Sequence, residues 1–245
     1  MKFSIVTVCK NNLAGLIKTV SSVLKQQDAD FEYIIYDGNS NDGTVEYIKS
    51  ITDSRLIWRS QNDSGIYDAL NKCIDLASGD YLLFLSSSDV LTYDNTLNKI
   101  EEKIRYRIAN DEPIVFYGKI VFLDNKKLTA KVSLEMKYNK YEVYKGVAIH
   151  HPSWIVPLNL YRKLGHYNKN YISMSDYDYL LRLYNHKIKF EYIDVSLVTK
   201  DPPGVSSDFW LCWKEAFSVR RNNNVPSLYN YFFTIRSLIA FLIKR

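Results

Sequence analysis

The segment GIYDALNKCIDLASGDYLLFLSSSD (65–89) predicts a helix followed directly by a buried strand. Residues 65–77 form the helical part, and residues 80–86 form an apolar run of the length that strands have. The run ends abruptly in three serines and one carboxylate, Ser86 to Asp89. The segments around this polar tip indicate why a buried strand should carry it.

The first hundred residues alternate between strand and helix patterns. Helical spacing follows Asn12, a residue type that caps helices, and a shorter helix is predicted near residues 42–51. The other strand-like runs lie at residues 2–8, 31–36 and 55–60. This alternation is typical of an α/β fold with a parallel sheet and right-handed crossovers.

Four loops follow the ends of these strands, at residues 7–12, 37–44, 60–65 and 86–89. The carboxyl ends of parallel strands meet at one edge of the sheet, where ligands of such folds bind. We therefore expect the four loops to line a single crevice. The carboxylates that they bring to it are Asp37, Asp42, Asp63 and Asp89.

The chain after residue 100 is less regular. The 20 tyrosines suit a binding cleft or the rim of a core, and residues 125–145 are basic, tyrosine-rich and weakly patterned. No segment has the composition of a linker, so one domain is the simplest interpretation. The predicted elements are one bent strand or a strand pair at 113–124, a strand at 153–157, helices at 158–165 and 175–186, a strand at 188–198, and a loop at 201–208 before the final helices.

Charge is distributed unevenly along the 245 residues. Residues 1–100 contain 9 Lys and Arg against 13 Asp and Glu, whereas residues 101–245 contain 23 against 14. A basic half favours an anionic partner, either a phosphorylated substrate or a phospholipid surface, unless it is simply a solvated lysine surface. The basic residues are scattered and accompany no recognised nucleic-acid-binding module, so we expect no nucleic acid partner.

The cysteines and the two ends of the chain indicate the cellular compartment in which the protein is expected. The three cysteines match neither a metal site nor a disulfide set, which favours a reducing cytoplasm, and the N-terminus lacks the pattern of a cleavable signal. The apolar SLYNYFFTIRSLIAFLIKR (227–245) is interrupted by Arg236 and is short of the ~20 apolar residues of a membrane span. It predicts either a helix lying in the plane of a membrane surface or a helix packed on protein.

The loop YDGNSNDGT (36–44) is built from turn-forming residues. Its glycines permit positive φ, and its Asn, Ser and Asp side chains can bond to nearby backbone. It is not the G-x-G-x-x-G fingerprint of dinucleotide sites, and the chain has no P-loop. Asp37 at the strand tip can accept a hydrogen bond from a base or sugar, or else brace the turn; Asp42 is expected to cap the next helix.

Four segments together resemble a family 2 glycosyltransferase of the GT-A fold: FSIVTVCKNN (3–12), YDGNSNDGT (36–44), residues 63–89 and SDYDYLLRL (175–183). The look-alikes are small bacterial enzymes that build O-antigen, capsule and colanic acid chains. The resemblance covers most of residues 1–208. It implies a mostly parallel nucleotide-binding sheet flanked by helices (1–100), an acceptor-binding catalytic half (101–208) and a C-terminal helical segment (209–245).

The resemblance also implies a donor site for a nucleotide-sugar, usually linked to UDP. Thr7 matches the residue at the end of the first strand that contacts the nucleotide, and Asp37 matches the aspartate that holds its uracil-ribose end. The residues that match the stretches bordering the donor are Asp63, Asp68, Asn71, Lys72 and Ser87.

Asp89 lies at the position of the family's D-x-D metal motif, and we expect it to hold Mg²⁺ or Mn²⁺. Ser86 and Ser88 depart from that motif, which leaves the coordination open. A divalent cation would offset the repulsion between a diphosphate and the acidic first half. The alternative is that Asp89 belongs to the start of the next helix.

Asp176 matches the family's catalytic base, which takes a proton from the acceptor hydroxyl. It lies in the first turn of a predicted helix, where the helix dipole favours the ionised form. Ser175 and Asp178 resemble a capping box, which leaves Asp176 free for another role. Asp178 is assigned a structural or acceptor-side role, and His151 an acceptor contact, with burial in the core as its alternative.

The resulting hypothesis is an inverting transfer of a hexose or N-acetylhexosamine to a glycan hydroxyl. The acceptor is expected on a lipid diphosphate at the inner face of the cytoplasmic membrane. Processive relatives carry Q-x-x-R-W where this chain has DPPGVSSD (201–208), so one addition per binding event is favoured. A GT-A protein that binds nucleotide or glycan without catalysis is the alternative; a nucleotidyltransferase would need a glycine-rich loop that is absent near the N-terminus.

Overall fold

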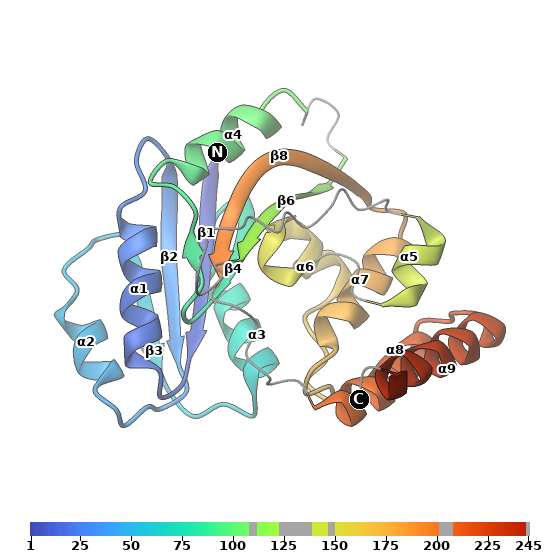
Figure 1. Cartoon of the computed structure of the whole chain (residues 1–245). Helices are drawn as coiled ribbons and strands as arrows, with labels where there is room; N and C mark the ends of the chain where they lie inside the picture. The colour runs from blue at the N-terminus through green and yellow to red at the C-terminus, as the bar shows by residue number, and fades with distance from the viewer. Residues whose placement is uncertain (108–111, 123–138, 147–149, 201–207, 244–245) are drawn as a thin grey trace.

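The computed structural model describes residues 1–107, 112–122, 139–146, 150–200 and 208–243. Within these residues eight strands form one curled sheet, in the order β3-β2-β1-β4-β7-β6-β8-β5. Helices cover both faces of the sheet, and a helical hairpin at the C-terminus packs beside the second half (Figure 1). The sheet and its helical layers have the α/β architecture that the sequence predicts.

The first half of the sheet is parallel, as predicted. Each strand begins in an apolar run and ends where turn-forming residues interrupt it. The strands are β1 (Lys2–Cys9), β2 (Asp30–Asp37), β3 (Leu56–Ser60) and β4 (Tyr81–Ser86), and the intervening helices are α1 (Leu13–Leu24), α2 (Thr44–Ser50) and α3 (Ile66–Leu76).

The second half extends this sheet with mixed strand directions. Strand β7 (Trp154–Pro157) runs antiparallel to β4 and to β6 (Ile114–Phe122), and β8 (Lys189–Lys200) runs parallel to β6. The short β5 (Val90–Leu91) pairs antiparallel with β8. The strand expected at 113–124 is a single strand whose register with β8 is irregular near Gly118, and residues 123 and 124 lie outside the described residues.

Helices complete the second half. They are α4 (Thr96–Ile104), α5 (Lys140–Lys145), the 3₁₀ turn η1 (His151–Ser153), α6 (Leu158–Leu164), α7 (Ser175–Asn185), α8 (Phe209–Asn222) and α9 (Ser227–Ile243). The expected loop at 201–208 and the weakly patterned stretch at 125–145 lie largely outside the described residues. The division of the chain at residue 208 stays a prediction, although α8 packs directly on α7.

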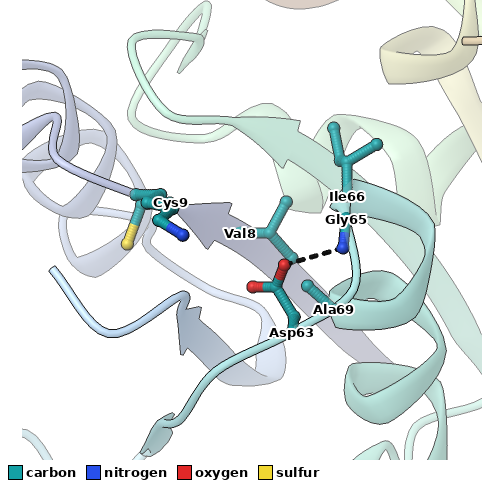
Figure 2. A pocket seen from close by; sticks show the side chains of 7 residues that line it. Val8, Cys9, Asp63, Gly65, Ile66 and Ala69 are labelled. Atoms are coloured by element: carbon teal, nitrogen blue, oxygen red, sulfur yellow. Dashed lines mark hydrogen bonds between the residues drawn. The ribbon is translucent and has the colours of Figure 1, made fainter. Parts of the chain in front are cut away.

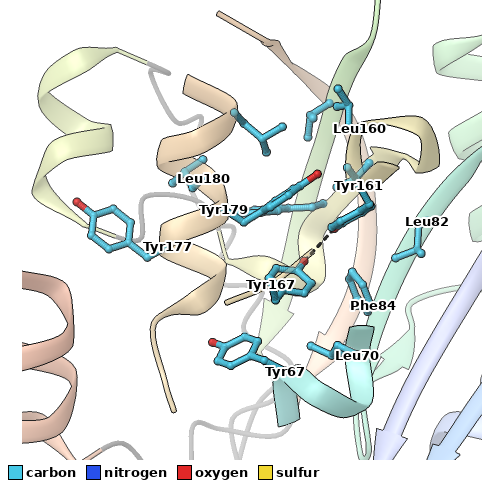
Figure 3. Close-up of a cluster of buried hydrophobic side chains, with 14 of the residues drawn as sticks. Tyr67, Leu70, Leu82, Phe84, Leu160, Tyr161, Tyr167, Tyr177, Tyr179 and Leu180 are labelled. Atoms are coloured by element: carbon cyan, nitrogen blue, oxygen red, sulfur yellow. Dashed lines mark hydrogen bonds between the residues drawn. The ribbon is translucent and has the colours of Figure 1, made fainter. Parts of the chain in front are cut away.

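Side chains alternate between two cores because successive strand residues point to opposite faces. Ile5 and Leu83 face α1, α2 and α4, whereas Val6 and Phe84 face α3, α6 and α7. The second core is rich in tyrosine: Tyr161, Tyr177 and Tyr179 are fully buried there. Figure 3 shows Tyr161 and Tyr179 beside Tyr167, and Tyr177 pointing away from them. Many of the tyrosines therefore build the core rather than a cleft.

Candidate functional site

A cleft lies at the carboxyl end of β1, and two of the four loops expected to line one crevice, 7–12 and 60–65, contribute to it; none of its lining residues comes from 37–44 or 86–89. Its volume is about 370 Å³. Figure 2 shows the side chains that line it, which come from the end of β1 and from the start of α3. The lining residues are Val8, Cys9, Lys10, Asp63, Gly65, Ile66 and Ala69.

Asp63 forms part of the cleft wall. Its Oδ1 accepts a hydrogen bond from the Gly65 amide at 2.9 Å, just before α3 begins. A Cβ at Gly38 would lie 2.7 Å from Asp63 Oδ2, so glycine at the end of β2 lets this carboxylate approach. The donor contact that the resemblance implies for Asp63 stays a prediction, and its position in the cleft is compatible with it.

Asp37 and Thr7 lie beneath the surface of this edge. Asp37 is fully buried, and its Oδ2 accepts from Ser60 Oγ at 2.6 Å and from the Ser40 amide at 3.0 Å. Thr7 is also fully buried, and its hydroxyl accepts from Tyr33 Oη at 3.0 Å. These contacts support the turn-bracing alternative for Asp37. The nucleotide contacts expected of both residues stay predictions.

Asp42 supports two helix starts but is the N-cap of neither. The N-cap of α2 is Gly43, with a φ of 92°, so the expected cap at Asp42 is wrong by one residue. Asp42 Oδ1 accepts from the Thr44 amide at 3.2 Å, and Oδ2 accepts from the Leu13 amide at 3.0 Å. Asn12 caps α1 as predicted, because its Oδ1 accepts from the Gly15 amide.

Helix α3 joins the two halves of the chain. Asp68 pairs with Lys72 one turn away and with Lys169 of the second half, both at 3.1 Å. Asn71 bonds through its side chain to both the amide and the carbonyl of Tyr167, each at 2.9 Å. Two of the residues expected to border the donor, Asp68 and Asn71, thus dock the loop that precedes α7; the donor contacts of Asp68, Asn71 and Lys72 stay predictions.

Asp89 is buried at the tip of β4, with 4% of its surface exposed. Its Oδ2 accepts from the Ser86 amide at 3.3 Å and lies 3.1 Å from Lys200 Nζ. Burial raises the pKa of Asp89, and the Lys200 charge opposes that rise. Ser87 Oγ donates to the Asn12 carbonyl at 3.4 Å, so this loop rests on the start of α1.

The loop does not offer the ligand set of a D-x-D metal site. Ser86 and Ser88 bring hydroxyls where that motif has carboxylates, and the carboxylate of Asp89 already faces an ammonium. In the part of the chain that the structure describes, no three His, Cys, Asp or Glu side chains are arranged to hold a metal ion. The residues present therefore fit a carboxylate-bound cation poorly.

Asp176 lies in the first turn of α7, half-buried against α3. Its Oδ1 accepts from the Tyr177 amide at 2.8 Å and from Tyr67 Oη at 3.3 Å. Burial raises the pKa of Asp176 to about 6, against the lowering effect of these hydrogen bonds. The carboxylate is therefore ionised at neutral pH yet more basic than an exposed aspartate, as a proton acceptor requires.

The expected capping box on α7 is wrong. Met174 occupies the N-cap without a side-chain bond, and among the described residues the buried Ser175 Oγ has no partner. Asp178 instead pairs with Arg182 Nε at 3.0 Å and accepts from Asn223 Nδ2 at 2.8 Å. Both of its oxygens hold α7 within the protein, which supports the structural role; an acceptor contact stays a prediction.

His151 packs inside the aromatic core. Its Nε2 lies 2.6 Å from Tyr167 Oη, and its ring stacks on Phe84 at 4.8 Å. Burial, with a smaller effect of Lys200, lowers the pKa of His151 to about 3, so the ring is neutral at physiological pH. This environment matches the alternative of a satisfied core histidine, and its acceptor contact stays a prediction.

Three residues of the site were not found by sequence reasoning. Tyr67 bonds to the carboxylate of Asp176, Lys200 pairs with Asp89, and Glu215 of α8 accepts from three backbone amides just before α7. The partners are separated by 109 residues for the tyrosine and by at least 41 for the glutamate. No local pattern signals such pairs.

Comparison with known proteins identifies the family. Residues 4–163 match the sequence model described as "Glycosyl transferase family 2". The chain belongs to this family. A PGL/p-HBAD biosynthesis glycosyltransferase of Mycobacterium bovis is 28% identical over 188 residues, which cover 75% of this chain and 70% of that protein. An uncharacterized glycosyltransferase of Mycobacterium tuberculosis is 32% identical over 181 residues, covering 73% and 67%.

Solved structures show the fold of this glycosyltransferase. Residues 1–349 of Staphylococcus aureus TarS, in complex with UDP-GlcNAc, superpose with a TM-score of 0.73 at 17% identity, covering 97% of this chain and 72% of that chain. The same TarS segment with UDP gives a TM-score of 0.69. The GT-A fold is therefore confirmed, as is membership of family 2.

Proposed function

We propose that this glycosyltransferase transfers a sugar from a UDP-sugar to a glycan hydroxyl with inversion at the anomeric carbon. The observation that carries the proposal is Asp176, a half-buried carboxylate with a pKa near 6 on the helix that faces α3. The cleft beside α3 supplies the donor side, and a TarS structure with UDP-GlcNAc shows that a neighbour of the same fold binds such a donor.

In the proposed reaction Asp176 acts as the base. Tyr67 and the Tyr177 amide both donate to its Oδ1, which orients the carboxylate, and we propose that Oδ2 faces the acceptor hydroxyl. The proton moves to Oδ2 while the hydroxyl oxygen attacks the anomeric carbon, and the nucleotide diphosphate leaves. A single displacement of this kind inverts the anomeric configuration, so an α-linked donor yields a β-linked product.

The proposed reaction does not depend on the expected Mg²⁺ or Mn²⁺. A divalent cation at Asp89 would supply positive charge to the leaving diphosphate, and family 2 enzymes commonly use one. Asp89 offers one buried carboxylate already paired with Lys200, so no step of the reaction is assigned to a metal.

The reaction class is tested by release of UDP. Purified protein is incubated with UDP-glucose, UDP-galactose and their N-acetyl forms, with lipid-linked and free glycan acceptors. We expect acceptor-dependent UDP release from one donor and a product of inverted configuration by NMR. Binding of a UDP-sugar without release, across the acceptor panel, would instead favour the catalytically inactive binding protein.

The outer face of α9 supports an acceptor at a membrane surface. Most of its apolar side chains are exposed, whereas its buried face combines Phe233 with two polar side chains: Asn230 and Thr234 each bond to the buried Arg220 at 2.8 Å. No helix among the described residues is long and apolar enough to cross a membrane. This face is formed by Leu228, Tyr231, Phe232, Ile235, Ile239, Leu242 and Ile243.

Contact between this outer face and a lipid surface is proposed because the hairpin also carries exposed cations. Lys214, Arg221 and Arg236 are exposed on α8 and α9, which matches an anionic headgroup layer around an in-plane helix. A lipid-linked acceptor would be held at the same surface. The alternative is a second protein surface, which sequence reasoning also left open.

The double variant Ile235→Glu, Ile239→Glu is expected to bind phosphatidylglycerol vesicles at least tenfold more weakly than wild type. Burial of one Ile side chain contributes ~1.5–3 kcal/mol, so two charges on this face remove most of the apolar attraction. Co-sedimentation with the vesicles measures it, and Tyr106→Glu, at an 84% exposed site outside the hairpin, is the control. Equal sedimentation of all three proteins contradicts membrane contact.

A further inference from the structure

Lys200 reaches the polar tip of β4 through strand register. In the antiparallel pair of β5 and β8, Val90 lies opposite Thr199 and Leu91 lies opposite Val198. One further step in this register brings Lys200 opposite Asp89, and the two side chains meet at 3.1 Å. The end of β8 therefore contributes a cation to the carboxyl edge of the sheet, at the loop 86–89, next to but not among the residues that line the cleft.

The two partners of this pair differ in their exposure. The Asp89 side chain is 6% exposed, whereas 27% of the Lys200 side chain remains exposed. A buried carboxylate is costly without a partner, so Asp89 anchors the ammonium at this position. An ammonium has three donors, and in the described part of the chain Asp89 is its one ion-pair partner, which leaves donors for a ligand.

His150, His151 and Lys72 are less suited to an anion than Lys200. His150 and His151 have lowered pKa values because of burial and, second, because of the Lys200 charge, so both rings are neutral at physiological pH. Lys72 Nζ already bonds to Tyr36 Oη at 2.9 Å and to the Asn62 carbonyl at 3.1 Å. Lys10 follows β1 directly and lines the cleft, where it is a second cation open to an anion.

Lys200 and a divalent cation would compete for Asp89. A metal ion bound to the Asp89 carboxylate would lie within a few ångströms of the ammonium, and like charges at that distance repel strongly in a partly buried site. The serines at positions 86 and 88 bring no further negative charge to offset this repulsion. Asp89 thus favours the lysine that is already there.

We propose that Lys200, held by Asp89, binds the diphosphate of the nucleotide-sugar and supplies the positive charge that a metal ion supplies in enzymes with a D-x-D motif. This inference rests on the proposed function, because it needs a nucleoside diphosphate in the cleft. A lysine ammonium is a compact cation that commonly binds phosphate. Asp89 is then a positioning residue rather than a metal ligand.

The test is calorimetric titration of UDP and of uridine, in EDTA and again with Mn²⁺. Wild type is expected to bind UDP in EDTA, and Lys200→Gln to bind it roughly 10- to 100-fold more weakly, because one charge-assisted contact is lost. Uridine affinity should stay unchanged, and Lys200→Arg should restore most of the UDP affinity. Lys189→Gln, at the opposite end of β8, is the matched control.

Lys200→Gln leaves the buried Asp89 carboxylate without its partner. The double variant Asp89→Asn, Lys200→Gln removes both charges, so it separates the loss of the lysine from the cost of an unpaired buried carboxylate. It should fold, bind uridine normally and show the same loss of UDP affinity. Loss of wild-type UDP binding in EDTA, or UDP affinity that both variants leave unchanged, would overturn the role of Lys200. Wild type that binds UDP under neither condition would refute the proposed donor instead.

Discussion

Asp176→Asn is expected to lower turnover by roughly 10²- to 10⁴-fold, because asparagine cannot take the acceptor proton. Binding of UDP should be unaffected, since the amide keeps the shape of the side chain and lies on the acceptor side. Steady-state UDP release and UDP titration measure the two effects separately. Asp194→Asn is the matched control, because Asp194 is an exposed aspartate whose contact is with Lys119.

The same substitution is expected to stabilise the fold at neutral pH. Burial raises the pKa of Asp176 from 3.8 to about 6, so the folded chain binds a proton more tightly than the unfolded chain. The stability gained from that proton is present below about pH 4 and is lost as pH rises through about 6. At pH 8 the variant should exceed wild type by roughly 1–3 kcal/mol in free energy of unfolding, with little difference at pH 4.

Denaturant unfolding at pH 4 and pH 8 checks whether the variant is the more stable protein only at the higher pH. The dependence of the wild-type rate on pH checks whether Asp176 acts as the base. In wild type the rate should fall about tenfold for each pH unit below the pKa of Asp176, because the protonated carboxyl cannot accept a proton. Near-normal turnover in Asp176→Asn, or a rate that does not change between pH 8 and pH 5, would remove Asp176 as the base.

Glu215→Ala is expected to destabilise the protein by roughly 2–4 kcal/mol and to reduce turnover with little change in UDP affinity. The buried Glu215 carboxylate accepts from the amides of Ile172, Ser173 and Met174 at 2.7, 2.8 and 3.1 Å. These amides immediately precede α7. Without their hydrogen bonds to Glu215, the turn that positions Asp176 is no longer held in place. Denaturant unfolding measures the loss of stability. Steady-state kinetics, with kcat and KM determined separately, measures the loss of turnover.

Glu142→Ala is the control for this prediction. Glu142 lies on α5 and pairs with Lys145 in a partly exposed contact, so its removal should change the free energy of unfolding by less than about 0.5 kcal/mol. Glu215→Gln should fall between alanine and wild type, because an amide keeps one acceptor oxygen. If Glu215→Ala matched Glu142→Ala in stability and activity, the positioning role would be wrong.

The fold could be predicted from the sequence because its signals are local. Apolar runs of strand length alternate with helical spacing, and each run ends in turn-forming residues, so the parallel half and its carboxyl edge follow from short-range rules. Asp89 at the tip of β4 and Asp176 in the first turn of α7 lie where those rules put them. Their roles came from a family resemblance, not from spacing.

Local rules failed to predict hydrogen-bond partners where a side chain has more than one possible partner nearby. Asp42 was assigned to one helix but supports the starts of two, and the pattern at Ser175 and Asp178 matched a capping box that does not form. Asp178 bonds instead to Arg182 and to Asn223, the residue that follows α8. A cap motif states which bonds are possible, while packing decides which are made.

Patterns within short windows of residues were enough for the alternating strands and helices of the first half, for the polar loops at the strand ends and for the family, but not for the short β5 and α5. The surroundings of each charge became visible in the folded chain: Asp89 meets Lys200, Tyr67 bonds to Asp176, and Glu215 holds the turn before α7. The two kinds of information differ in the distance along the chain over which they act. Periodicity and turn chemistry act over a few residues, whereas the partner and the desolvation of a charge depend on strand register and helix packing between distant segments.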